Sequence, residues 1–303
     1  MTVRIDERRF RGEPAITLEA GELTATFLPC VGMTGVSMRW RGREYLAVPG
    51  GIAQLRAGAT AGLPLLAPWA NRLASRRYRA AGVTVDLTGL PLPVDPNGLP
   101  IHGLLVGAPG WRVDRADTRR ATARLRASID VDAPAFPFAH RIEVAVTARD
   151  GELGVETSVI LTGRRRVPVA FGWHPYLRLP GVPRAQWRLR LPPRRHLALD
   201  SFGIPTGAAV AERGEEAPIA RRTFDDLYAL GRDRRLSFRV DGGPSIEVRS
   251  DAGYPYGQVW VPAGRGFAAL EPMVAPTNAL ATGSAPLVGP GDSYTARFTL
   301  ALA

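Results

Sequence analysis

The stretch HRIEVAVTARDGELGVETSVILTG, residues 140–163, decides the fold class of this chain. Apolar and polar side chains alternate through both of its halves, and a period of two is typical of strands that bury one face. The halves are separated by Asp150-Gly151, a dipeptide that favours the positive backbone torsions of a tight hairpin turn. The stretch therefore predicts two antiparallel strands joined by a short turn.

The same alternation recurs along the chain in short runs bounded by glycine, proline or aspartate. Asp241-Gly242 separates one further pair of runs, as a hairpin requires. RTFDDLYALG, residues 222–231, could hold one helical turn, but no segment has the pattern of a capped amphipathic helix. No linker, repeat or low-complexity block divides the chain. We therefore expect a single domain over residues 1–303, with an all-β fold, a large antiparallel sandwich and little helix. The alternating runs are residues 16–29, 78–89, 121–131, 140–163, 235–251 and 294–303.

The composition bears on the partners of the protein. The 303 residues are 45% hydrophobic, which allows a full core, and their formal net charge is +11. All 39 basic residues are arginines, and they are scattered along the chain. With no recognisable nucleic-acid motif, we interpret them as a compositional bias rather than a nucleic-acid-binding face.

Other features of the sequence concern the compartment. Cys30 is the only cysteine, so the chain can form neither an intramolecular disulfide nor a cysteine-rich metal site. The N-terminal residues lack the apolar stretch of a secretory signal, and no apolar run reaches membrane-spanning length. We expect a soluble, cytoplasmic protein with no membrane partner. The sequence leaves open whether it is a monomer or a homodimer.

His174 in VAFGWHPYLRL (169–179) and Glu271 in FAALEPMVAPTNAL (267–280) are ionisable residues that each precede a proline. A following proline ring favours extended backbone at the residue before it. Histidine titrates closest to neutral pH, and a carboxylate in an apolar run is costly to bury unless it is paired or functional. His174 could instead be a core histidine, and strand alternation could turn Glu271 to solvent. Our hypothesis is that the two form an acid/base pair.

Aromatic residues flank His174. Trp173, Pro175 and Tyr176 could together present a flat, rigid surface that stacks on a ligand ring. We interpret His140, at the head of a strand, and His196, in a basic segment, as structural. The histidines are not spaced as a metal site, and neither a glycine-rich phosphate loop nor a G-x-S-x-G motif is present. The sequence therefore predicts no metal and no cofactor.

Further polar residues interrupt the strand pattern in loops, where binding groups tend to lie. Asn71 and Arg72 offer donors suited to hydroxyl or anionic oxygens, although Arg72 could be a solvated surface arginine. His102 could be a turn residue only. Asp225 and Asp226 could cap a short helix.

Six segments, in order along the chain, resemble those of the aldose 1-epimerases, or galactose mutarotase-like proteins. The matches run from about Leu28 to Asn278 and are specific to the superfamily, not to a substrate. Leu177 is a departure, because the family usually has an aromatic residue after HPY. The segments are LPLLAPWANRL, IHGL, FGWHPYL, IPTG, TFDDLY and LEPMVAPTNA.

The resemblance implies a β-supersandwich fold and the interconversion of the α and β anomers of an aldose without a cofactor. It implies that His174 is the general acid for the ring oxygen and Glu271 the general base for the anomeric hydroxyl. This requires a protonated His174 and an ionised Glu271, and we expect the two to act from opposite sides of the ring. The resemblance further implies that five residues hold the sugar: Asn71, Arg72, His102, Asp225 and Gln258.

Two alternatives to a free-aldose mutarotase remain. The surplus of arginines would suit an epimerase for a sugar bearing a phosphate or sulfonate, and a second arginine converging on the pocket would favour it. The chain could also be a non-catalytic sugar-binding module on the same scaffold. Retention of both His174 and Glu271 argues against that alternative, because binding alone needs no proton donor and acceptor.

Overall fold

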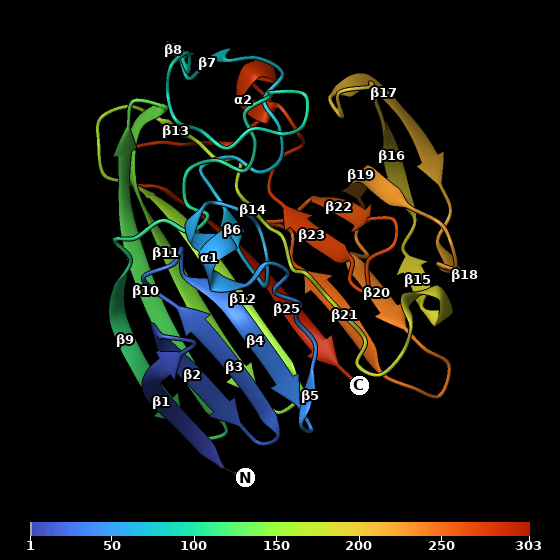
Figure 1. Ribbon diagram of the computed structural model, residues 1–303. Helices are drawn as coiled ribbons and strands as arrows, with labels where there is room; N and C mark the ends of the chain where they lie inside the picture. The colour runs from blue at the N-terminus through green and yellow to red at the C-terminus, as the bar shows by residue number, and fades with distance from the viewer. Residues whose placement is uncertain (1) are drawn as a thin grey trace.

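Antiparallel strands make up nearly all of the regular structure in the computed structural model, which describes residues 2–303 (Figure 1). Each alternating run forms strands, so the all-β prediction is confirmed. The turn at Asp150-Gly151 joins β11 (Phe136–Arg149) to β12 (Glu152–Leu161), with Arg149 paired to Glu152. Gly151 has a φ of 71°, as this tight turn requires. Asp241-Gly242 likewise lies between the paired strands β20 (Arg235–Arg239) and β21 (Ser245–Ser250).

The N-terminal strands form a five-stranded meander, drawn in blue in Figure 1. It packs against the green strands of a second, larger sheet. Its strands are β1 (Val3–Phe10), β2 (Glu13–Ala20), β3 (Leu23–Leu28), β4 (Thr34–Trp40) and β5 (Arg43–Glu44).

The larger sheet has nine strands in the order β18-β15-β20-β21-β25-β12-β11-β10-β9. The C-terminal strand β25 lies between β21 and β12, so it joins the group β18, β15, β20 and β21 to the group β12, β11, β10 and β9. Besides those already given, its strands are β9 (Arg112–Arg119), β10 (Thr122–Ala133), β15 (Arg188–Leu191), β18 (Glu215–Pro218) and β25 (Ser293–Leu302).

A seven-stranded sheet with the order β17-β16-β19-β22-β23-β14-β6 carries the functional residues described below. Its strands are β6 (Leu65–Leu66), β14 (Gly172–Trp173), β16 (Arg194–Leu199), β17 (Pro205–Glu212), β19 (Phe224–Leu230), β22 (Tyr256–Val261) and β23 (Ala269–Met273). Two further pairs complete the strands: β7 (Arg77–Ala80) with β8 (Val83–Asp86), and β13 (Val167–Pro168) with β24 (Leu287–Val288).

Helix is confined to three short segments in residues 2–303: α1 (Gly51–Arg56), α2 (Ala279–Thr282) and the 3-10 turn η1 (Arg184–Gln186). None of the helices in this range has the length and apolar character needed to span a bilayer. The helical turn considered for residues 222–231 is wrong, because this segment forms β19 between β16 and β22. Pairing on both sides satisfies its backbone groups, which a single helical turn could not do.

One hydrophobic core cluster contains side chains from all three large sheets. Leu18 comes from the N-terminal sheet, Val146 from the nine-stranded sheet and Val259 from the seven-stranded sheet, and all three are fully buried. A core shared in this way supports our proposal that residues 1–303 form one domain.

Candidate active site

One face of the seven-stranded sheet carries a row of polar side chains. Asp225 on β19 is paired with Trp260 on β22, and Gln258 on β22 is paired with Glu271 on β23. Residues directly opposite each other in a sheet point to the same face, as do residues two apart in one strand. These four side chains therefore share one face. Leu227 and Met273, two residues further along β19 and β23, continue this face with apolar side chains, which cluster with Leu66 and Ala70.

His174 reaches the same place from the end of β14. Strand β14 lies between β6 and β23, with Gly172 paired to both Leu66 and Met273. The chain then runs on in register, and the His174 amide donates to the carbonyl of Pro64. The imidazole therefore lies beside β23, the neighbouring strand, which carries Glu271.

The His174 and Glu271 side chains are in direct contact. The distance from His174 Nε2 to Glu271 Oε1 is 3.4 Å, and both side chains are almost fully buried. The expectation that the two act from opposite sides of a sugar ring is therefore wrong. They form one adjacent donor–acceptor pair because their strands are neighbours in the sheet.

Burial sets the protonation of this pair. It lowers the pKa of the His174 imidazole to about 3 and raises the pKa of the Glu271 carboxyl well above its usual value. The charge of Asp225 raises the pKa of Glu271 further, and the charge of Arg72 opposes this. The surroundings thus favour a neutral imidazole and a protonated carboxyl, the reverse of the ionisation expected from the sequence.

The Arg72 side chain is held by acceptors on three sides. Nε donates to Asp95 Oδ2 at 2.8 Å, one terminal nitrogen donates to Asn71 Oδ1 at 3.1 Å, and the other lies 3.6 Å from Asp225 Oδ2. Asp225 Oδ1 in turn accepts from Gln258 Nε2 at 2.7 Å. Arg72 is therefore a fixed part of the wall and not a solvated surface arginine.

The loops that carry Asn71 and His102 are joined to each other. Both residues have positive φ angles, 57° and 61°, which is uncommon for residues other than glycine and typical of functional loops. The His102 amide donates to the Asn71 carbonyl. At Gly103 a Cβ atom would lie 2.2 Å from the carbonyl oxygen of Ala67, so only glycine fits between the loops.

Aromatic side chains enclose the imidazole. The Tyr176 ring stacks on the His174 ring with centroids 4.6 Å apart, and the Trp260 ring is nearly perpendicular to it with centroids 5.3 Å apart. Trp173, which we expected on this surface, points the other way and donates from Nε1 to Thr157 in the core. Strand alternation explains the correction, since His174 and Trp173 are consecutive and face opposite sides.

All seven residues proposed from the sequence line one pocket. The structure shows that these residues converge on one pocket, whereas their roles in it stay predictions. Sequence reasoning missed Thr60 and Trp260 in the pocket wall and Asp95, which anchors Arg72 from behind. DPNG at 95–98 is a turn signal, and an aspartate that begins such a turn beside a functional loop is the one hint that the sequence offered. The pocket is lined by Thr60, Asn71, Arg72, Ile101, His102, His174, Tyr176, Asp225, Gln258, Trp260 and Glu271.

The buried carboxyl of Glu271 is expected to reduce stability at neutral pH. Because its folded-state pKa is raised above the ordinary 4.5, its stabilising contribution is complete below about pH 4.5 and is lost as pH rises through the folded-state pKa. Glu271→Gln should therefore raise the free energy of unfolding at pH 7 by about 1 to 3 kcal/mol.

Urea unfolding of both proteins at several pH values from about 4 to about 8 measures this effect. The gain should grow with pH, whereas Glu143→Gln on an exposed strand position should change stability by less than about 0.5 kcal/mol at every pH. A Glu271→Gln variant that is less stable than the wild type at pH 7 would contradict the buried-charge argument.

The fold and the pocket define a class of protein, and comparisons with solved structures agree. A galactose mutarotase-like protein from Clostridium acetobutylicum superposes with a TM-score of 0.87 at 19% identity, over 99% of this chain and 98% of that one. A galactose 1-epimerase from Lactobacillus acidophilus superposes with a TM-score of 0.77 at 12% identity, over 100% and 98%. The GalM/aldose epimerase homologue from C. elegans gives 0.76 at 17% identity, over 100% and 99%. These similarities show a galactose mutarotase-like fold.

The sequence also matches a family model. The aldose 1-epimerase model matches residues 14–301, so the chain belongs to the aldose 1-epimerase family. No curated protein matches the chain. The resemblance found in the sequence and the expected fold are thereby confirmed, and the chain is a sugar epimerase of this family.

Proposed function

We propose that this protein interconverts the α and β anomers of a free aldose by opening and reclosing its ring, without a cofactor. The observation that carries the proposal is the contact of 3.4 Å between His174 Nε2 and Glu271 Oε1 at the buried end of the pocket. The ring oxygen and the anomeric hydroxyl of an aldose are bonded to the same carbon. An acid and a base that touch each other therefore match two reacting oxygens that are neighbours.

The pair needs one proton between its two members. Burial favours this proton on Glu271, while the acid role of His174 requires it on the imidazole. The two arrangements contain the same number of protons, so a shift across the contact converts one into the other. We propose that hydrogen bonds from sugar hydroxyls to Glu271, added to the Arg72 charge that already opposes the raised pKa of this carboxyl, drive this shift when the substrate binds.

The reaction then balances on these two residues. His174 gives its proton to the ring oxygen as the bond from this oxygen to the anomeric carbon breaks. Glu271 takes the proton of the anomeric hydroxyl, and the carbonyl of the open chain forms. Rotation about the adjacent carbon–carbon bond and the reverse transfers give the other anomer. A positioned acid or base contributes about 10²- to 10⁴-fold to such a step.

The remaining pocket residues suit the hydroxyls of one sugar ring. Asn71, Arg72 and His102 offer donors, and Asp225 accepts. The cavity of about 140 Å³ lies below the roughly 300–1,000 Å³ of pockets for drug-sized ligands, and so suits a single monosaccharide. Trp260 provides the apolar edge against which the ring can lie.

The charges in the pocket favour an uncharged sugar over a phosphorylated or sulfonated one. Among the described residues that line it, Arg72 is the only arginine, and its nitrogens already face Asp95, Asn71 and Asp225. Two carboxyl groups, Asp225 and Glu271, also face the cavity. The phosphate or sulfonate group of a charged sugar would meet no free guanidinium there.

Polarimetry of freshly dissolved α-glucose and α-galactose tests the proposal, with glucose 6-phosphate in a parallel assay. The wild type should speed the approach to the anomeric equilibrium for at least one of the two free sugars, and more than for the phosphate. Faster equilibration of glucose 6-phosphate alone would establish the charged-sugar alternative. Saturable binding of the free sugars without any acceleration would establish the binding module.

A further inference from the structure

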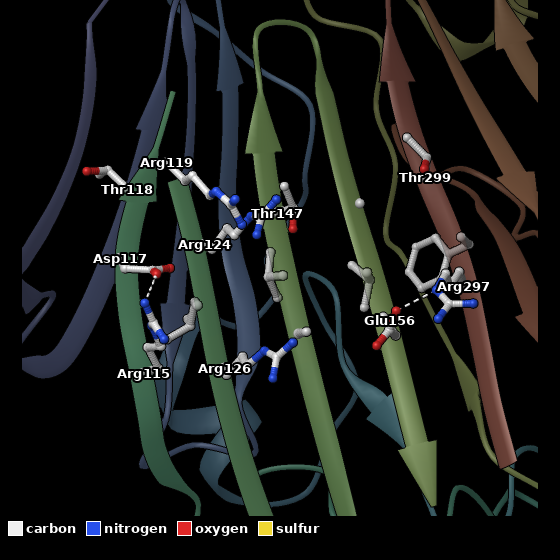
Figure 2. A pocket seen from close by; sticks show the side chains of 16 residues that line it. Arg115, Asp117, Thr118, Arg119, Arg124, Arg126, Thr147, Glu156, Arg297 and Thr299 are labelled. Carbon is white, nitrogen blue, oxygen red and sulfur yellow. Dashed lines mark hydrogen bonds and ion pairs between the residues drawn. The ribbon is translucent and has the colours of Figure 1, made fainter. Parts of the chain in front are cut away.

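A second hollow lies far from the sugar pocket in the fold, on the outer face of the nine-stranded sheet (Figure 2). It is a trough of about 650 Å³ across β9, β10, β11, β12 and β25, and it shares no lining residue with the sugar pocket. Its floor is made of small side chains, among them Ala145, Thr147 and Gly154. Arginines stand on both sides of this floor in Figure 2.

The arginines of this sheet follow a pattern that composition alone does not explain. Every arginine of β15, β20, β21 and β25 lies at salt-bridge distance from a carboxylate. The same holds for Arg112, Arg115 and Arg141. Within residues 2–303, the arginines of this sheet that have no such partner are Arg119, Arg124, Arg126 and Arg149, and all four lie at one corner formed by β9, β10 and β11.

Two of these side chains lie beside Thr147. Arg124 is paired in register with Asp117 on one side and with Thr147 on the other, and Arg119 is two residues from Asp117 on the same face. Figure 2 shows the guanidinium groups of Arg119 and Arg124 reaching toward the Thr147 side chain. In the described part of the chain, the buried Nε of Arg124 has no hydrogen-bond partner.

Neighbouring positions add further positive charge that does not stabilise the sheet. Arg126 lies directly opposite Arg115, a like-charge pair that is unfavourable in a sheet. A smaller hollow of about 480 Å³ adjoins the trough and shares Arg119 and Arg124 with it. Arg120 and Arg149 also line it. Two arginines thus stand where two hollows meet, surrounded by further arginines.

We propose that this corner binds a phosphate group, either free or as the monoester of a small molecule whose body lies along the trough. A tetrahedral dianion offers several acceptor oxygens, so it can take the forks of Arg119 and Arg124 and the Thr147 hydroxyl from different directions. A carboxylate has one charge and two oxygens, too few for this cluster. The trough volume lies in the range typical of small-molecule sites.

A nucleic-acid backbone fits the same face less well. Such a ligand needs a continuous basic track, because each further phosphate must meet another cation. Here the track is interrupted by Asp117, paired with Arg115, and by Glu156, paired with Arg297. The free positive charge is confined to one corner, which suits one phosphate group.

Isothermal titration calorimetry at low ionic strength tests this site, with inorganic phosphate and glycerol 3-phosphate as probes because neither contains a sugar ring. The wild type should bind both saturably, and the double variant Arg119→Gln/Arg124→Gln should bind them at least about tenfold more weakly. Arg79→Gln/Arg165→Gln removes the same charge from exposed positions elsewhere and should bind as the wild type does. Anomer interconversion should be unchanged in both variants.

Three results would overturn the proposal. The first is the absence of saturable phosphate binding in the wild type. The second is an equal loss in the control variant, which would show an effect of net charge only. The third is tighter binding of a short DNA duplex than of glycerol 3-phosphate through the same two arginines, which would make the ligand a polyanion. Far-ultraviolet circular dichroism of each variant confirms that the sheet is intact.

Discussion

Replacing His174 with asparagine is expected to lower kcat for anomer interconversion by about 10²- to 10⁴-fold. The imidazole lies 3.4 Å from Glu271 Oε1, and in the proposed reaction it carries the proton to the ring oxygen. Asparagine keeps a polar group of similar reach but cannot exchange a proton near neutral pH. KM should change much less than kcat, because the hydroxyl-binding residues stay in place.

The chain offers a matched control for this variant. His196 is part-buried and contacts two carboxylates, Glu212 at 3.0 Å and Asp226 at 3.6 Å, but lies on the opposite face of the same sheet. His196→Asn should leave kcat within about twofold of the wild type, a change of about 0.4 kcal/mol in the barrier. If His174→Asn kept wild-type kcat, His174 would not be the acid, and Glu271 would have to act with another partner.

Replacing Asp95 with alanine is expected to lower the free energy of unfolding by about 3 to 5 kcal/mol, although this residue is not in the pocket wall. Its carboxylate is 1% exposed and forms the ion pair with Arg72. Its Oδ1 also accepts the amides of Asn97 and Leu99, both at 2.9 Å. Removal would leave a part-buried guanidinium without its main partner, and two loop amides without their acceptor. Urea unfolding measures the loss.

Two further variants separate the two roles of Asp95. Asp95→Asn can keep the acceptor for the loop amides but loses the ion pair, so its loss of stability should be intermediate. Asp86→Ala removes an exposed aspartate that accepts one loop amide, from Thr88, and lies 3.6 Å from an exposed arginine. It should cost less than about 1 kcal/mol. Equal losses for Asp95→Ala and Asp86→Ala would mean that the Arg72 ion pair adds nothing.

Asp95 and Glu271 show opposite effects of buried charge in the same site. The Asp95 carboxylate is paired and accepts two amides, and these contacts lower its pKa even though burial opposes them. Glu271 is equally hidden, and its burial, together with the charge of Asp225, raises its pKa. The first charge stabilises the loop that holds Arg72. The second reduces stability and keeps a proton available for transfer, as is common where activity and stability conflict.

The candidate site was largely predictable because its residues interrupt a regular pattern. His174 and Glu271 each stand before a proline, and Asn71 and His102 occupy loops between alternating runs. Gln258 had no such mark and came only from the resemblance. Trp260, two residues after Gln258, reads as an ordinary strand aromatic, so nothing in the sequence separated it from the core.

The sequence by itself determined the fold class, the hairpins and the side chains that can carry protons. These depend on contacts within a few residues, such as the alternation through β11 and β12 and the turn at Gly151. Only the tertiary structure decided that Glu271 touches His174, that residues 222–231 form β19, and that unpaired arginines gather at one corner of the outer face. The physical reason is that alternation tells which face a side chain takes but not which strand becomes its neighbour. Strand order is fixed by packing between segments far apart in the chain, and with it the distances, the burial and the pKa values that the chemistry needs.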